Sequence, residues 1–173
     1  SSHSKPEEGI VNLALGLGKT IVDGSTCWSY SPAYPTAPPP YNSISELLKT
    51  TQTEFWAVTL EKPFLYDPVN EVEYLVKENL ERAETDGTLA ETCSTYNGQS
   101  DRLYPGIFGD GPRLLNFAAL LKGIDFEFND LIKKLLEICE DNYKTDVEIE
   151  FAMATDSTSG KSPVFGFLQV RPM

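Results

Sequence analysis

The sequence predicts an α+β domain in which a mixed or antiparallel β-sheet packs against helices. Short apolar segments of strand length recur between turn residues, and two segments of helical period interrupt them. The chain has 173 residues, 40% of them hydrophobic, which is enough for one core and too few for two domains. We therefore expect residues 1–173 to form a single domain, closed by a C-terminal β-hairpin.

Two strands are expected near the start of the chain. Residues 10–15 form an apolar run that predicts a buried strand, and this run ends at Gly16 and Gly18. Residues 26–31 predict a second strand. Residues 32–42 follow and contain five prolines, which predicts an exposed loop because proline lacks a backbone donor.

Residues 43–96 are predicted to form a short helix and several strands, from a helix-capping pattern and from the distribution of apolar residues. Ser43 and Glu46 have the spacing of a capping box before a short helix. Residues 53–60 are apolar on both faces, which predicts a strand in the middle of a sheet. Residues 72–82 mix strand and helix signals, so both remain open, and residues 90–96 predict another strand.

Two helices are expected in the second half. Pro112 suits a first helical turn, and residues 114–122 continue that helix until Gly123 stops it. Asn129 can cap a second helix that runs to Asp141. This second helix has one apolar side, which predicts packing against the sheet.

Composition excludes several classes of function. Lysine and arginine number 14 against 26 acidic residues, a net charge of −12 that repels nucleic acids and anionic membrane surfaces. No apolar run is long enough to span a membrane. The three cysteines form no C-x-x-C pair and there is one histidine, so a disulfide framework or a zinc site is not expected. These features predict a cytoplasmic protein.

The C-terminal hairpin carries the sharpest chemical pattern. Residues 147–153 alternate apolar and polar side chains, residues 164–171 predict the partner strand, and residues 155–163 predict the loop between them. Matching the apolar faces places Glu150 opposite Gln169 and Glu148 opposite Arg171. In that register Phe165 and Phe167 share the polar face, and the apolar face holds Val164, Gly166, Leu168 and Val170.

This polar face has two interpretations. Carboxylate and amide oxygens suit Mg²⁺, and a guanidinium beside them is shaped to hold a phosphate. The alternative is an ordinary solvent-exposed face on which Glu148 and Arg171 form a surface ion pair. Spacing alone favours the ordinary face, because polar hairpin faces are common.

The glycine segment after the first strand fits no phosphate-loop motif. A Walker A loop would need glycine where Leu13 stands, and a dinucleotide fingerprint would need glycine where Ile21 stands. What remains is a strand that meets a tight glycine turn, followed by another turn over Ile21-Val22-Asp23-Gly24. Such glycines either let the backbone approach a ligand or merely allow positive φ, and the segment alone favours the structural reason.

Taken together, the motifs resemble one known family. The stretch Gly16-Leu-Gly-Lys-Thr-Ile-Val-Asp-Gly24, followed by Pro32, resembles a segment of phosphoenolpyruvate synthase and pyruvate phosphate dikinase. Val147-Glu-Ile-Glu-Phe-Ala152 and Leu168-Gln-Val-Arg-Pro172 resemble the ending of the same PEP/pyruvate-binding, ATP-grasp domain. Thr92-Cys-Ser-Thr-Tyr96 and Gly111-Pro-Arg-Leu-Leu-Asn-Phe117 are similar to segments of a bacterial branch.

The resemblance implies the C-terminal portion of an ATP-grasp nucleotide-binding domain. It implies that Glu150 and Gln169 coordinate Mg²⁺ that bridges the phosphates of ATP. Arg171 would be catalytic and contact the phosphates, and Gly16, Gly18 and Gly24 would lie at the cofactor. Glu148 has no counterpart in the family motif and enters only through the register. The parent would be a kinase that moves phosphoryl groups from ATP through a phosphohistidine to pyruvate.

The chain also departs from the family. Glu150 and Gln169 are 19 residues apart, a longer interval than the family has. The upstream half of the ATP site, with its lysine and arginine, has no counterpart before residue 9, and the phosphohistidine domain is absent. We therefore expect the chain to need these parts of its parent as partners and to be inactive alone. The alternative is a non-catalytic protein-interaction domain that retains the ATP-grasp-like fold.

Overall fold

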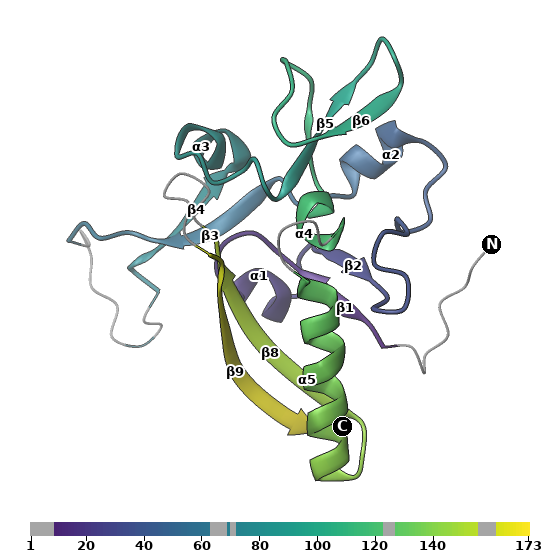
Figure 1. Cartoon of the computed structure of the whole chain (residues 1–173). Helices are drawn as coiled ribbons and strands as arrows, with labels where there is room; N and C mark the ends of the chain where they lie inside the picture. Colours follow the sequence, from purple (N-terminus) through teal and green to yellow (C-terminus); the bar gives the residue numbers. More distant parts are fainter. Residues whose placement is uncertain (1–8, 63–68, 70–71, 123–126, 156–161) are drawn as a thin grey trace.

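The computed structural model describes residues 9–62, 69, 72–122, 127–155 and 162–173 (Figure 1). Within these ranges the chain forms both helices and strands, and every strand pairing is antiparallel, which is typical of an α+β architecture. The strands of the described residues pair in four small antiparallel sheets, three of two strands and one of three. The expected fold class is thus confirmed at the level of α+β, with several small sheets in place of one larger sheet.

The two N-terminal strands are shorter than predicted but lie where expected. β1 (Val11–Leu13) pairs antiparallel with β2 (Trp28–Tyr30). The first and last residues of each strand are buried, and the middle residue is exposed. A single helical turn, α1 (Lys19–Val22), follows the glycine turn and was not predicted. Four residues give no apolar period for the sequence to reveal.

The proline-rich segment 32–42 is a loop without regular structure and leads into α2 (Ile44–Lys49). Ser43 caps this helix, since its hydroxyl accepts a hydrogen bond from the amide of Glu46 at 3.1 Å. The carboxylate of Glu46 reaches back to the amide of Asn42 at 3.0 Å. The predicted cap is confirmed, with the return bond one residue earlier than in a standard capping box.

β3 (Glu54–Val58) pairs with β4 (Leu75–Asn79), and α3 (Leu80–Thr85) begins directly after β4. The mixed signals of residues 72–82 are therefore both real, because a strand and a helix share that segment. The prediction of a central strand is wrong among the described residues, since β3 has β4 as its one strand partner there. The ring of Trp56 is covered by the ammonium groups of Lys19 and Lys77, where a central strand would be covered by the rest of the sheet or a helix.

The three-stranded sheet has the order β6-β5-β7, formed by Arg102–Pro105, Cys93–Asn97 and Arg113–Leu115. The predicted helix over 114–122 is wrong in its first half. Leu114 and Leu115 pair with β5 and are fully buried, and the helix α4 spans only Ala118–Lys122. A short apolar run fits either period, and pairing with β5 decides it. Gly123, the expected stop, lies outside the described residues.

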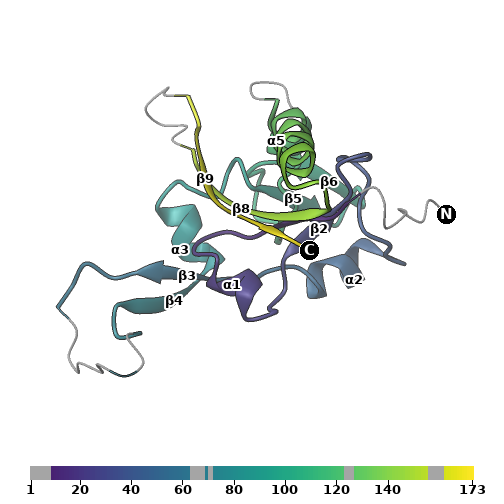
Figure 2. The same ribbon diagram turned by 90° about the horizontal axis from the view of Figure 1, so that it is seen from below.

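The last helix, α5 (Phe128–Tyr143), runs alongside the hairpin of β8 (Val147–Ala154) and β9 (Val164–Pro172), as both views show (Figure 2). Asn129 is not the cap, because the helix begins one residue before it. Its side chain instead donates a hydrogen bond to the carbonyl of Pro32 at 2.9 Å, which ties α5 to the proline-rich loop.

The main core lies between β1, β2, α5 and the hairpin. Phe128 and Ile132 of α5 are almost completely buried there, with the aromatic rings of Phe151 and Phe165 packed against them. A second, smaller core under α3 contains Leu89 and Cys93. No helix in the described ranges combines the length and apolarity needed to cross a bilayer.

Candidate functional site

The hairpin β8–β9 has the predicted register at its polar end. Glu150 lies directly opposite Gln169, and Glu148 lies opposite Arg171. Because residues two apart in a strand share a face, these four side chains project from one side of the ribbon. On the other side Val147 is buried, which fixes the register from the core.

The register changes immediately beyond this pair. Phe151 pairs with Phe167, so Leu168 is an extra residue in β9 and forms a β-bulge. The predicted assignment of Phe165 and Phe167 to the polar face is therefore wrong. Beyond the bulge Phe165 pairs with Met153 and Phe167 pairs with Phe151, away from the face of Glu150. The ring of Phe165 packs on the core and stacks on that of Phe151 at 5.2 Å.

The bulge also reverses the predicted apolar face of β9. Val164 and Leu168 are 68% and 64% exposed, although the alternation predicted both to face the core. The physical reason is that both faces of residues 164–168 are apolar, so the ring of Phe165 can take the core side while Phe167 remains 43% exposed. The outward face of the hairpin thus has a polar end, with Glu148, Glu150, Gln169 and Arg171, and an apolar end that begins at the bulge. Bulges recur beside functional sites, where they redirect side chains.

Arg171 and Glu148 form a two-point ion pair across the polar end. The Nη2 and Nε atoms of Arg171 donate to the two carboxylate oxygens of Glu148 at 2.8 and 3.2 Å. This hydrogen bonding lowers the pKa of Glu148 and raises the pKa of Arg171, to which the charge of Glu150 also contributes. Both groups are about half exposed, so the pair is also what an ordinary surface would show.

Glu150 and Gln169 differ from that pair, because neither side chain makes a hydrogen bond or ion pair with any residue in the described ranges. Both are exposed, and their strand positions face each other directly. One carboxylate and one amide oxygen are therefore available to a ligand. Among the described residues no group of three or more acidic, cysteine or histidine side chains could hold a metal by itself. The hairpin can supply part of a coordination shell and no more.

The predicted cofactor glycines are placed differently. Gly16 has φ +83°, and a Cβ there would collide with the carbonyl oxygen of Trp56. The glycine thus permits a close approach to β3, where the amide of Leu17 donates to that same oxygen at 2.9 Å. Gly18 and Gly24 face open space, with no heavy atom within 4 Å of a Cβ built on either.

The structure packs α1 mainly against β3, whereas β8 packs against β9 and α5. The main packing contacts of α1 therefore do not bring the glycine segment to Glu150 and Gln169. Glu150, Gln169 and Arg171 come together as predicted, whereas no hydrogen bond between described residues joins the segment 16–24 to them.

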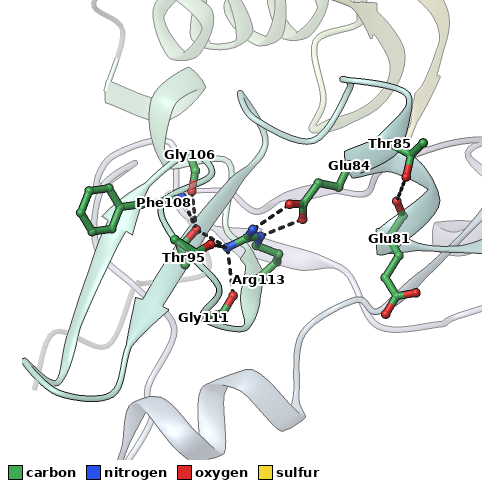
Figure 3. A network of polar contacts seen from close by, with 9 residues as sticks. Glu81, Glu84, Thr85, Thr95, Gly106, Phe108, Gly111 and Arg113 are labelled. Carbon is green, nitrogen blue, oxygen red and sulfur yellow. Dashed lines mark hydrogen bonds and ion pairs between the residues drawn. The ribbon is translucent and has the colours of Figure 1, made fainter.

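The most extensive polar network was not predicted as such and centres on Arg113 (Figure 3). Its side chain is 14% exposed and makes a two-point ion pair with Glu84 of α3, at 2.7 and 2.8 Å. Its Nη1 donates to the hydroxyl of Thr95 and to the carbonyls of Gly109 and Gly111. Every acceptor belongs to the protein, so the guanidinium fixes the loop before β7 and is not free to bind a ligand.

The one sequence signal for this network is an arginine next to two buried leucines. A buried arginine needs a carboxylate partner, and the sequence does not show which of 26 acidic residues supplies it.

No protein-family model, curated protein or solved structure matches this chain.

Proposed function

We propose that the polar end of the β8–β9 hairpin binds the phosphates of a metal–nucleotide complex, as the C-terminal part of a phosphoenolpyruvate synthase-like ATP-grasp site. The observation that carries the proposal is the direct opposition of Glu150 and Gln169, with Arg171 in the next cross-strand pair on the same face. These two pairs are neighbours on one face of the hairpin. They bring together a carboxylate, an amide and a guanidinium, which are groups that can bind a metal-bound phosphate.

The donor chemistry fits Mg²⁺. This ion prefers hard oxygen ligands and is held in nucleotide sites by one or two protein groups together with phosphate oxygens and water. Glu150 and Gln169 would hold it, since their oxygens have no partner among the described residues. When bound, the ion would offset phosphate charge during phosphoryl transfer.

Arg171 would contact the phosphates, and Glu148 would position it. Two of the guanidinium nitrogens are held by the carboxylate of Glu148, while Nη1 has no hydrogen-bond partner within the described ranges. Held in this way, the side chain would lose less conformational freedom when a phosphate binds. Glu148 would thus be a positioning residue, a role that the family motif does not include.

The site is incomplete in this chain, which agrees with a need for further parts of a parent protein. The hairpin offers two metal ligands and one cation, and the chain carries a net charge of −12 that repels a nucleotide. The upstream half of the ATP site would supply the missing positive charge. We therefore expect weak nucleotide binding by the 173 residues alone and no turnover.

Electron paramagnetic resonance of free Mn²⁺ tests the proposal, because the signal falls as the ion binds. With ATP present, wild-type chain should reduce the signal more than Glu150→Gln, at concentrations where Mg²⁺ competes. Glu140→Gln on α5 is the matched control, since it removes the same charge from an exposed site elsewhere and should behave as wild type. Equal Mn²⁺ binding by all three proteins would show that the acidic surface binds the ion without a site and would favour the protein-interaction alternative.

A further inference from the structure

A groove of about 170 Å³ lies between the α1–β2 connection and the β3–β4 ribbon, and none of its lining residues belongs to the hairpin. Side-chain hydroxyls dominate its wall, from Thr20, Ser25, Thr26 and Thr53. The indole of Trp56 and the charged side chains of Glu54 and Lys77 also line the groove. The groove joins segments that the sequence separates by more than fifty residues, so it exists only in the folded chain.

The polar groups of this wall divide into two sets. Gln52 is fully used by the fold, because its amide bonds both the N–H and the carbonyl of Leu15 and also the carbonyl of Glu54. Thr51 likewise donates to the carbonyl of Leu115 at 3.1 Å. These bonds hold the wall in place.

Thr20 belongs to the second set. The residue is only 4% exposed, but its hydroxyl oxygen is not among the fully buried unpaired atoms of the described residues, and it makes no hydrogen bond with any of those residues. This oxygen therefore remains accessible at the groove, where it can bond a ligand. The hydroxyls of Ser25, Thr26 and Thr53 are also without partners in the described ranges. Four groups that can both donate and accept thus line one groove.

The charges of the groove cancel. Lys77 and Glu54 form an ion pair at 2.7 Å, so neither presents an uncompensated charge to a ligand. The ammonium groups of Lys19 and Lys77 lie 5.5 and 5.9 Å from the centre of the Trp56 ring, which holds the indole in place. Lys19 is itself paired with Asp23 at 2.9 Å. An anion would therefore meet two paired lysines and a carboxylate, in a chain that is strongly negative overall.

We propose that this groove binds a small neutral polyhydroxylated molecule of monosaccharide size, with the Thr20 hydroxyl as its anchoring contact. A ligand rich in hydroxyls supplies both donors and acceptors to the hydroxyl groups of the groove wall. It can be neutral, because the charged side chains of the groove already pair with each other. The volume is below the roughly 300–1,000 Å³ of pockets for drug-sized ligands, so the groove suits a single sugar ring and is too small for a whole nucleotide. The proposal does not depend on the function of the hairpin.

Amide chemical-shift titrations with D-ribose, D-glucose and inorganic phosphate test it. Saturable shifts at Thr20, Thr26 and Trp56 with at least one sugar are expected. Thr20→Val removes the hydroxyl at nearly constant volume and should weaken binding about five- to tenfold. Thr20→Ser keeps the hydroxyl and should retain affinity within about twofold.

Thr26→Val provides a second variant at an exposed position, where loss of folding is not expected, and should also weaken sugar binding. The proposal is overturned if neither sugar gives saturable shifts at these residues. It is equally overturned if phosphate binds there more tightly than both sugars, or if Thr20→Val binds sugar as well as Thr20→Ser does.

Discussion

The guanidinium of Arg113 and the carboxylate of Glu84 face each other in a two-point ion pair that joins the start of β7 to α3. The two residues are 29 positions apart in the sequence. The remaining Nη1 atom of Arg113 bonds the loop that precedes β7, so one side chain connects a helix, a strand and a loop (Figure 3). Such a junction makes sharp predictions about stability.

Replacing Arg113 with methionine should lower the free energy of unfolding by about 2–4 kcal/mol, because it leaves the Glu84 carboxylate and two loop carbonyls without their donor. Urea denaturation measures this. Arg113→Lys should recover only part of the loss, since an ammonium group cannot reproduce the two-point geometry. A full recovery by lysine would show that charge alone matters at this position.

The same pair predicts a pH dependence. Hydrogen bonding to Arg113 lowers the pKa of Glu84 in the folded chain below its unfolded value. The contribution of Glu84 to stability is therefore complete above the unfolded pKa and is lost as the pH falls through the folded pKa. Urea midpoints of wild type and Glu84→Gln should differ near neutral pH, and the difference should shrink as the pH falls below the unfolded pKa of a glutamate, about 4.3. A difference that is independent of pH would contradict this account.

Gly16→Ala should destabilise the chain by about 2 kcal/mol or more, since the new Cβ would collide with the Trp56 carbonyl and the backbone has positive φ. Gly18→Ala is the control, because it has ordinary φ and open space around it. That change should alter stability by less than about 1 kcal/mol. Thermal or urea denaturation of both variants distinguishes them, and similar losses would argue against the close approach to β3.

The bulge at Leu168 predicts which side of β9 carries the core. Phe165→Ala should lower stability by about 2–3 kcal/mol, because the Phe165 ring packs on Phe151. Val164→Ala should change stability by less than about 0.5 kcal/mol, since Val164 is exposed. The opposite order of these two losses in urea denaturation would indicate a regular ribbon without the bulge.

The sequence predicts the polar half of the hairpin because only one register buries Val147 while Glu148 and Glu150 stay in water. It cannot predict the bulge. Both faces of residues 164–168 are apolar, and the choice depends on the fit of Phe165 against Phe151 and Phe128. Local alternation contains no information about that contact, since the three rings come from separate elements.

The error at β7 has a similar cause. Residues 113–115 satisfy a helical and an extended reading equally well, and their pairing with β5 decides between them. Arg113 then acquires its partner from α3, which no local pattern identifies. By contrast, the Ser43 cap and the proline-rich loop were predictable, because caps and prolines act through the backbone within a few residues.

The most direct test of the proposed metal–nucleotide site is paramagnetic broadening of the amide signals by Mn²⁺ with ATP, which detects weak binding and locates it. The account predicts selective, Mg²⁺-reversible broadening around Glu150, Gln169 and Arg171 that Glu150→Gln abolishes and Glu140→Gln preserves. Broadening spread over the acidic residues of α5, or absent from the hairpin at every concentration of the complex, would contradict it.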